Sequence, residues 1–212
     1  MEQVPSCVST VCILQFPYLN FITGSLEDED VVCAVGGRDR SGAALSSMEC
    51  FDPSTDQWSL RASLSLPREY LKLVSLDGFL YAIGGRVNGR YTNSCERYSY
   101  QDNDWIAIAS MITPRGSTGA ASHGGKIYAM GGWKGENLSS CECYSPLNDT
   151  WSEVQGFSAA RADLMAITIN NFIYAIGGNR GTTVEKYSPL KNTWEAAPTL
   201  KTYRFQLAAV GI

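Results

Sequence analysis

Short apolar runs, each closed by a pair of glycines, recur along the chain at a nearly constant distance. The four doublets begin at Gly36, Gly84, Gly131 and Gly177, which places them 48, 47 and 46 residues apart. Short apolar runs that end in residues with free backbone angles are typical of buried strands. The pattern therefore predicts one β unit that is repeated four times.

Three further positions follow each doublet in a fixed order. They are a glutamate in a Glu-x-aromatic motif (Glu49, Glu96, Glu142, Glu185), a tryptophan (Trp58, Trp105, Trp151, Trp194) and an arginine (Arg68, Arg115, Arg161, Arg204). Glu to Trp is always 9 residues, Trp to Arg is always 10, and Arg to the next doublet is always 16. Only the interval from doublet to Glu varies, as 13, 12, 11 and 8. Insertions are tolerated where the backbone faces solvent, so one surface loop per unit absorbs all the length variation.

The intervals predict four strands per unit, which we call a to d. Strand a follows the Arg, b ends at the doublet, c carries the Glu and d carries the Trp. Because such a unit cannot bury both of its faces alone, neighbouring units must stack on one another.

The doublet, the Glu-x-Tyr motif, the spaced Trp and the period just under fifty together resemble kelch repeats. The resemblance covers Val31–Ile212 and implies an all-β fold, a kelch β-propeller with four recognisable four-stranded blades. Residues 1–30 are then an N-terminal extension and 31–212 the propeller. The repeats lie near 31–68, 69–115, 116–161 and 162–204, followed by a closing strand at 205–212.

The two ends of the repeat array complement each other. The first repeat has no recognisable strand a, whereas the chain ends on an orphan strand a at Phe205–Ile212. We therefore predict that the C-terminus supplies strand a of the first blade, which hides two sheet edges. Kelch propellers most often have six blades. Either four blades close into a monomeric ring, which the complementary ends favour, or a shortened propeller stays open or forms a homodimer.

Composition and charge exclude several classes of partner. The chain has a formal net charge of −4 and no Lys/Arg cluster, so no nucleic-acid or membrane partner is expected. The apolar stretch at 7–22 is interrupted by Pro17 and Asn20, and the first basic residue is Arg38, which fits neither a secretory signal nor a membrane span. We predict a cytoplasmic protein.

The cysteines and the single histidine predict no catalytic chemistry. Seven cysteines without a CxxC pair are interpreted as reduced thiols. Cys95 and Cys141 occupy the same position of their repeats, which is expected to lie in the core. Cys50 and Cys143 share a position with Arg97 and Lys186, so we expect them to face outward and regard them as redox-sensor candidates. Glu, Trp and Arg recur in every repeat and are interpreted as scaffold. His123 stands alone, so we predict no catalytic residue, no metal site and no cofactor.

The b–c and d–a loops of a propeller emerge on the same face, where we expect a protein partner to bind. Exposed Arg, Tyr and Trp are the residue types of interaction hot spots. The candidates are Arg38, Arg40, Tyr70, Arg86, Arg90, Tyr91, Ser117, Trp133 and Arg180. A basic, aromatic surface of this kind suits an acidic or phosphorylated loop of the partner.

The chain is similar to the kelch half of BTB–kelch proteins, the substrate adaptors of cullin-RING ubiquitin ligases, through segments such as Leu80–Gly85. It carries neither a BTB nor a BACK segment, so the resemblance implies substrate capture without ligase docking. A cytoskeletal, actin-binding kelch protein is the alternative within the class of binding proteins. An enzyme on a propeller scaffold is the alternative from another class, and the lack of histidines opposes it.

Overall fold

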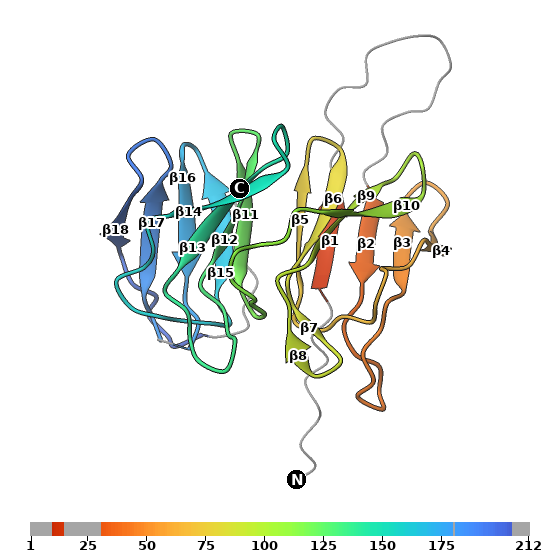
Figure 1. Ribbon diagram of the computed structural model, residues 1–212, viewed down its shortest axis with the longest axis horizontal. Helices are drawn as coiled ribbons and strands as arrows, with labels where there is room; N and C mark the ends of the chain where they lie inside the picture. Colours follow the sequence, from red (N-terminus) through yellow and green to blue (C-terminus); the bar gives the residue numbers. More distant parts are fainter. Residues whose placement is uncertain (1–9, 15–30, 180, 205–212) are drawn as a thin grey trace.

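All regular structure in the described part of the chain is β. The computed structural model describes residues 31–179 and 181–204, and the backbone of 10–14 (Figure 1). Four antiparallel four-stranded sheets follow one another along the sequence, and a two-stranded ribbon projects from the second. Within these ranges no helix is long and apolar enough to span a membrane.

Each sheet contains strands in the order a, b, c, d from one edge to the other. The first sheet comprises β1 (Thr10–Leu14), β2 (Val31–Val35), β3 (Met48–Asp52) and β4 (Gln57–Arg61). The second comprises β5 (Lys72–Leu76), β6 (Phe79–Ile83), β9 (Cys95–Ser99) and β10 (Asp104–Ile108). The third comprises β11 (Gly119–His123), β12 (Lys126–Met130), β13 (Cys141–Ser145) and β14 (Thr150–Val154). The fourth comprises β15 (Met165–Ile169), β16 (Phe172–Ile176), β17 (Val184–Ser188) and β18 (Thr193–Ala197), and the ribbon pairs β7 (Arg86–Val87) with β8 (Arg90–Tyr91).

Strand a of the first sheet comes from the N-terminal side of the chain, which corrects the sequence prediction. β1 pairs antiparallel with β2 over its full length, with Cys12 opposite Cys33. The position that we assigned to 205–212 is therefore filled by residues 10–14, and 205–212 lie outside the described residues. The prediction failed because Thr10–Leu14 is preceded by neither the Arg nor the spacing that marks strand a elsewhere.

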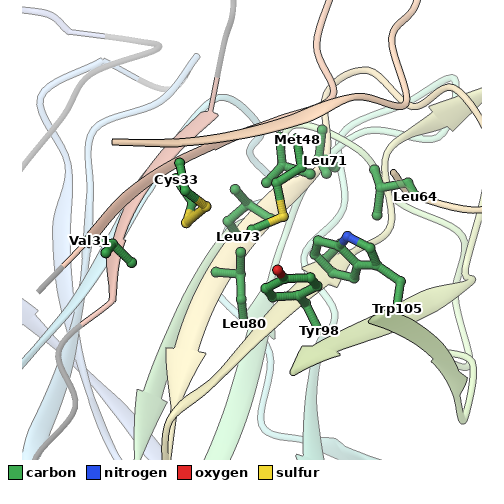
Figure 2. Close-up of a cluster of buried hydrophobic side chains, with 12 residues drawn as sticks. Val31, Cys33, Met48, Leu64, Leu71, Leu73, Leu80, Tyr98 and Trp105 are labelled. Atoms are coloured by element: carbon green, nitrogen blue, oxygen red, sulfur yellow. A yellow bond between two sulfur atoms is a disulfide. The ribbon is translucent and has the colours of Figure 1, made fainter. Parts of the chain in front are cut away.

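The hydrophobic core lies between neighbouring sheets, in three layers that we call seams. In the first seam, side chains of β2 and β3 pack on the second sheet, where Leu73, Leu80, Tyr98 and Trp105 meet Val31, Cys33 and Met48 (Figure 2). Equivalent clusters join the second sheet to the third and the third to the fourth. Because both faces of the inner sheets are covered, their b strands β6 and β12 are apolar at nearly every position, as expected for strands buried on both sides.

The glycine doublets bring each sheet close to the loop that leads to the next one. Gly84 has a φ of +57°, and a Cβ there would lie 2.2 Å from the carbonyl oxygen of Arg115. The next amide, of Gly85, donates a hydrogen bond of 2.8 Å to the same carbonyl. A side chain at Gly84 is thus excluded both by backbone strain and by space.

The a strands stack side by side along the inside of the array. β5 lies between β1 and β11, and β11 lies between β5 and β15. Among the described strands, no comparable packing joins β15 back to β1. The outermost strands of the terminal sheets, β4 and β18, lie at opposite ends of the longest axis of the molecule (Figure 1).

The cysteines depart from the prediction in two ways. Cys33 on β2 and Cys50 on β3 face each other in the strand register and form a disulfide, so they are not the reduced thiols that we expected. Cys50 and Cys143 are both buried rather than outward-facing. Burial raises the pKa of Cys143 and raises the pKa of Cys95 to about 11 and of Cys141 to about 12, which opposes a role as reactive thiolates.

Candidate functional site

The repeated Arg, Glu and Trp residues hold neighbouring sheets together. Arg115 and Glu142 form an ion pair of 2.5 Å in which both side chains are almost completely buried. The same guanidinium donates hydrogen bonds to the carbonyl oxygens of Gly131 (2.7 Å) and Ser140 (2.9 Å). Equivalent pairs join Arg68 to Glu96 at 2.6 Å and Arg161 to Glu185 at 2.7 Å. Their recurrence at every seam confirms the interpretation as scaffold.

Each seam Glu also accepts hydrogen bonds from the sheet before it. Glu142 accepts from the amides of Ile112 (2.6 Å) and Thr113 (3.0 Å), both in the loop that precedes Arg115. The carboxylate therefore caps the d–a loop of one sheet while it lies on strand c of the next. Such multiple donation to a buried carboxylate is the condition under which a buried charge is tolerated.

The seam Trp supplies both packing and a hydrogen bond. Trp151 is 9% exposed, and its indole N–H donates to the carbonyl oxygen of Ala109 on the preceding sheet at 2.9 Å. Trp105 and Trp194 make the same bond to Ala62 and Gln155. Trp58 differs, because it is 52% exposed, so the interpretation of the repeated Trp as scaffold is wrong for the first repeat.

The b–c and d–a loops meet on one face of the array, as the sequence predicted; the β7–β8 ribbon marks it at the lower edge of Figure 1. We call this surface the loop face and define it by Arg38, Glu69, Tyr70, Arg86, Tyr91, Ser117 and Trp133. Backbone hydrogen bonds connect its segments: the amide and carbonyl of Glu69 pair with those of Arg86, and those of Gly116 pair with those of Trp133.

Two predicted arginines share one carboxylate on the loop face. Glu69 forms ion pairs with Arg38 and with Arg86, the latter at 3.3 Å. The guanidinium of Arg38 also lies over the ring of Tyr70, 5.4 Å from its centroid. Glu69 was not among the predicted residues, although it is the one acid at a position where the other repeats have Gly116, Ala162 and Phe205. The loop face is therefore less basic than its arginines alone suggest.

The aromatic residues of the loop face are held in place by close packing. The ring of Tyr91 lies against Gly116, where a Cβ would come within 3.0 Å of it. Burial raises the pKa of the Tyr91 phenol, while the charge of Arg86 opposes the shift, so the hydroxyl stays neutral near pH 7. Tyr91 is thus available as a hydrogen-bond donor beside the arginines.

One position of the d–a loop adopts a strained backbone in three successive repeats. Tyr70, Ser117 and Asp163, each two residues after the seam Arg, have φ values of 54°, 50° and 56°. The amide of Ser117 donates to the carbonyl of Tyr70, and the amide of Asp163 donates to that of Ser117. Left-handed backbone at non-glycine residues is costly and is concentrated at functional sites. This backbone conformation fixes the half-buried side chains of Tyr70, Ser117 and Asp163 on the loop face.

The remaining predicted residues lie at the rim or outside the described part. Arg40 and Arg90 are exposed at loop tips, and Arg180 lies outside the described residues. The loop of Arg40 is ordered by Asp39, whose carboxylate accepts hydrogen bonds from Ser41 and from the amide of Ala43; these bonds lower the pKa of Asp39. Among the described side chains, no group of three His, Cys, Asp or Glu could bind a metal ion.

The repeats, sheets and seams define a propeller-type repeat protein, and comparison with known families gives the same class. The chain belongs to the kelch-repeat family: the KLHDC2/KLHL20/DRC7 Kelch-repeats domain matches residues 22–178, and the Kelch motif matches 160–201. Membership of this family supports a protein-interaction module.

Several known proteins are similar to half of the chain. Kelch-like protein 28 of Homo sapiens is 32% identical over 115 residues, which is 50% of this chain and 20% of that protein. Kelch-like ECH-associated protein 1B of Danio rerio is 37% identical over 109 residues, covering 50% of this chain and 18% of that protein. Alpha-scruin of Limulus polyphemus is 30% identical over 118 residues, covering 52% of this chain and 12% of that protein. The chain thus matches a fifth or less of the length of each relative.

Proposed function

We propose that the loop face binds an acidic or phosphorylated segment of a protein partner, without catalysis, in the manner of the substrate-binding part of a ubiquitin-ligase adaptor. The observation that carries this proposal is the cluster of Arg38, Arg86, Tyr70 and Tyr91 around the single carboxylate of Glu69. Both arginine side chains remain about one-third exposed, so each can turn donors toward a ligand while it is held by Glu69.

Glu69 is an acidic group within the site that already pairs with both arginines. An acidic ligand would bind these arginines together with Glu69 or in its place. The arginines are already ordered by it, which lowers the entropy that binding must overcome. Trp133 and Tyr91 supply apolar contact area beside these charges, a combination that hot spots favour.

The sign of the response to one substitution tests the charge of the partner. Glu69→Gln frees both arginines while it keeps the shape of the side chain, so an acidic partner should bind more tightly. Asp102→Asn, in a c–d turn at the other end of the sheets, removes the same charge and should leave affinity unchanged. Capture from lysate with quantitative mass spectrometry, followed by titration of the captured segment as a peptide, measures both.

The triple variant Arg38→Glu, Arg86→Glu and Trp133→Ala should lose the captured partner. Because the variant leaves the buried carboxylate of Glu69 beside two like charges, its melting temperature is measured first, and capture is then tested well below that temperature. If capture survives the triple change, another surface binds the partner. Co-sedimentation with F-actin that the triple change leaves intact would favour the cytoskeletal alternative instead.

A further inference from the structure

The first and fourth sheets each have one face that no neighbouring sheet covers in the described structure. The leading face, on the first sheet, carries Glu49, Phe51, Trp58 and Leu60; the last of these is 76% exposed. The trailing face, on the fourth sheet, carries Tyr174 and Ile176 with the following loop at 198–204. Tyr174 and Ile176 are half-buried, whereas their counterparts Tyr81 and Ile83 in the second sheet are buried.

The two faces carry complementary halves of a seam. In every internal seam the earlier sheet supplies an Arg, and the later sheet supplies a Glu and a Trp. Arg204 is the seam Arg that follows the fourth sheet, and Glu49 is the seam Glu of the first sheet. Both side chains are exposed, and among the described residues neither forms an ion pair.

The tryptophan repeats this relationship. Each internal seam Trp donates to the carbonyl of the residue four positions after the preceding Trp, which is Ala62, Ala109 or Gln155. The corresponding residue after Trp194 is Pro198, which is exposed and retains its carbonyl oxygen. The indole N–H of Trp58 has no acceptor among the described residues.

The trailing face already has the backbone conformation of an internal seam. The amide of Gly178 donates to the carbonyl of Arg204 at 2.9 Å, as Gly132 does to Arg161 at 2.9 Å. The amide of Leu200 donates to the carbonyl oxygen of Thr182 at 2.8 Å, as the amide of Phe157 does to the carbonyl oxygen of Ser139 at 2.9 Å. On the leading face, Glu49 and Trp58 lie on strands with the same register as β13 and β14. A partner with the matching face would therefore find a preformed surface.

We propose that the trailing face of one copy of this chain docks on the leading face of a second copy, where Arg204 pairs with Glu49 and Trp58 donates to Pro198. A second copy is the occupant because it presents the required groups at the required spacing. Within one copy, the described strands β15 and β1 are not neighbours. Each copy has one leading and one trailing face, so two copies form a closed dimer when both pairs of faces dock. If the second pair of faces does not meet, further copies add and larger oligomers form.

The new seam has fewer hydrogen bonds than an internal one. Ala109 donates its amide to Asp149, and Tyr144 donates its hydroxyl to the same oxygen. The corresponding residues are Pro198, which has no amide hydrogen, and Phe51, which has no hydroxyl. The association is accordingly reversible and depends on concentration.

Light scattering and sedimentation velocity over a range of concentrations test this proposal. The wild-type mass should rise from 23.1 kDa to a multiple of that value. Glu49→Arg and Arg204→Glu should each raise the dissociation constant by at least about 30-fold, because each leaves a charge buried beside a like charge. Lys191→Glu, an exposed charge reversal in a c–d turn, is the matched control and should change nothing.

Mixing the two variants distinguishes a second copy from closure within one chain. In a mixed pair, the leading face of the Glu49→Arg copy meets the trailing face of the Arg204→Glu copy, so one seam has its ion pair reversed and the other seam is native. The mixture should therefore recover the multimer, as should the double variant alone. A wild type that stays at 23.1 kDa at every concentration would overturn the proposal. So would a multimer that both variants leave intact, or single variants that only lower the melting temperature of a monomer.

Discussion

The third sheet and the first sheet carry the same motif residues at the same spacing, yet those residues lie in opposite environments. Glu142 and Trp151 are buried against the second sheet, whereas Glu49 and Trp58 are exposed. The strand register around them is the same. The motif therefore specifies where a side chain points, and the presence of a neighbouring sheet decides whether it is buried.

This difference has an energetic consequence. A buried ion pair adds little stability relative to apolar residues of the same shape, but removal of one partner leaves an uncompensated charge in the interior. Glu142 and Arg115 carry that penalty, and burial likewise lowers the pKa of Arg68 and of Arg161 while the neighbouring glutamate opposes the shift. Glu49 is exposed to solvent and carries no such penalty.

The largest predicted effect comes from the seam glutamate. Glu142→Gln should lower the free energy of unfolding by about 3–5 kcal/mol, because Arg115 then stays buried without a counter-charge. Glu49→Gln should change it by less than about 0.5 kcal/mol, as expected for an exposed position. Chemical denaturation at a concentration where the chain is monomeric measures both.

The difference between the two changes in the free energy of unfolding tests whether the first sheet has an uncovered face. Equal destabilisation by Glu142→Gln and Glu49→Gln would show that the first sheet is covered in solution by a seam within its own chain. A small effect of both would show that the internal ion pairs are solvated.

The repeat fold was predictable because its signals are local and repeated. The doublets, the constant intervals and the apolar runs located strands b, c and d of every sheet, and the variable interval located the loop face. Strand β1 was not predictable from these signals, since Thr10–Leu14 carries none of the motif residues and is recognised only by its pairing with β2.

The contacts on the loop face were less predictable than its location. The arginines and aromatic residues could be listed from the variable loops, but their sharing of Glu69 depends on the approach of two loops that are 31 and 17 residues from it in sequence. The disulfide was missed for the same reason: the register that places Cys33 opposite Cys50 follows from a loop whose length differs in every repeat.

The disulfide distinguishes the first sheet from the other three. At the positions of Cys33 and Cys50 the other sheets pair a Tyr on strand b with Arg97, Cys143 or Lys186. The bond closes a loop with a sequence separation of 17 residues, for which the entropic contribution is about 3 kcal/mol. Reduction should therefore destabilise the first sheet, which has only one covered face, by about that amount.

Hydrogen exchange with and without reductant measures this effect sheet by sheet. Protection of β2 and β3 should fall on reduction, while protection of β16 and β17 should not change. The double variant Cys33→Ala, Cys50→Ala should show no response to reductant. If alkylation under non-reducing conditions labels both Cys33 and Cys50, the bond is absent in solution.

The smallest predicted effect concerns a hydroxyl that three sheets have and the first lacks. Tyr144 donates to Asp149 at 2.8 Å, and Asp149 in turn accepts from Ala109 on the preceding sheet, so the hydroxyl supports a seam contact. Tyr144→Phe should lower the free energy of unfolding by about 1 kcal/mol, the usual contribution of such a bond. Asp56 lies two residues before Trp58, as Asp149 lies two residues before Trp151. In the monomer, Phe51→Tyr should change the free energy of unfolding by less than about 0.5 kcal/mol, because the leading face is solvated and water competes for Asp56. Thermal and chemical denaturation of the two variants give the comparison directly, and a stabilisation by Phe51→Tyr as large as the loss in Tyr144→Phe would contradict it.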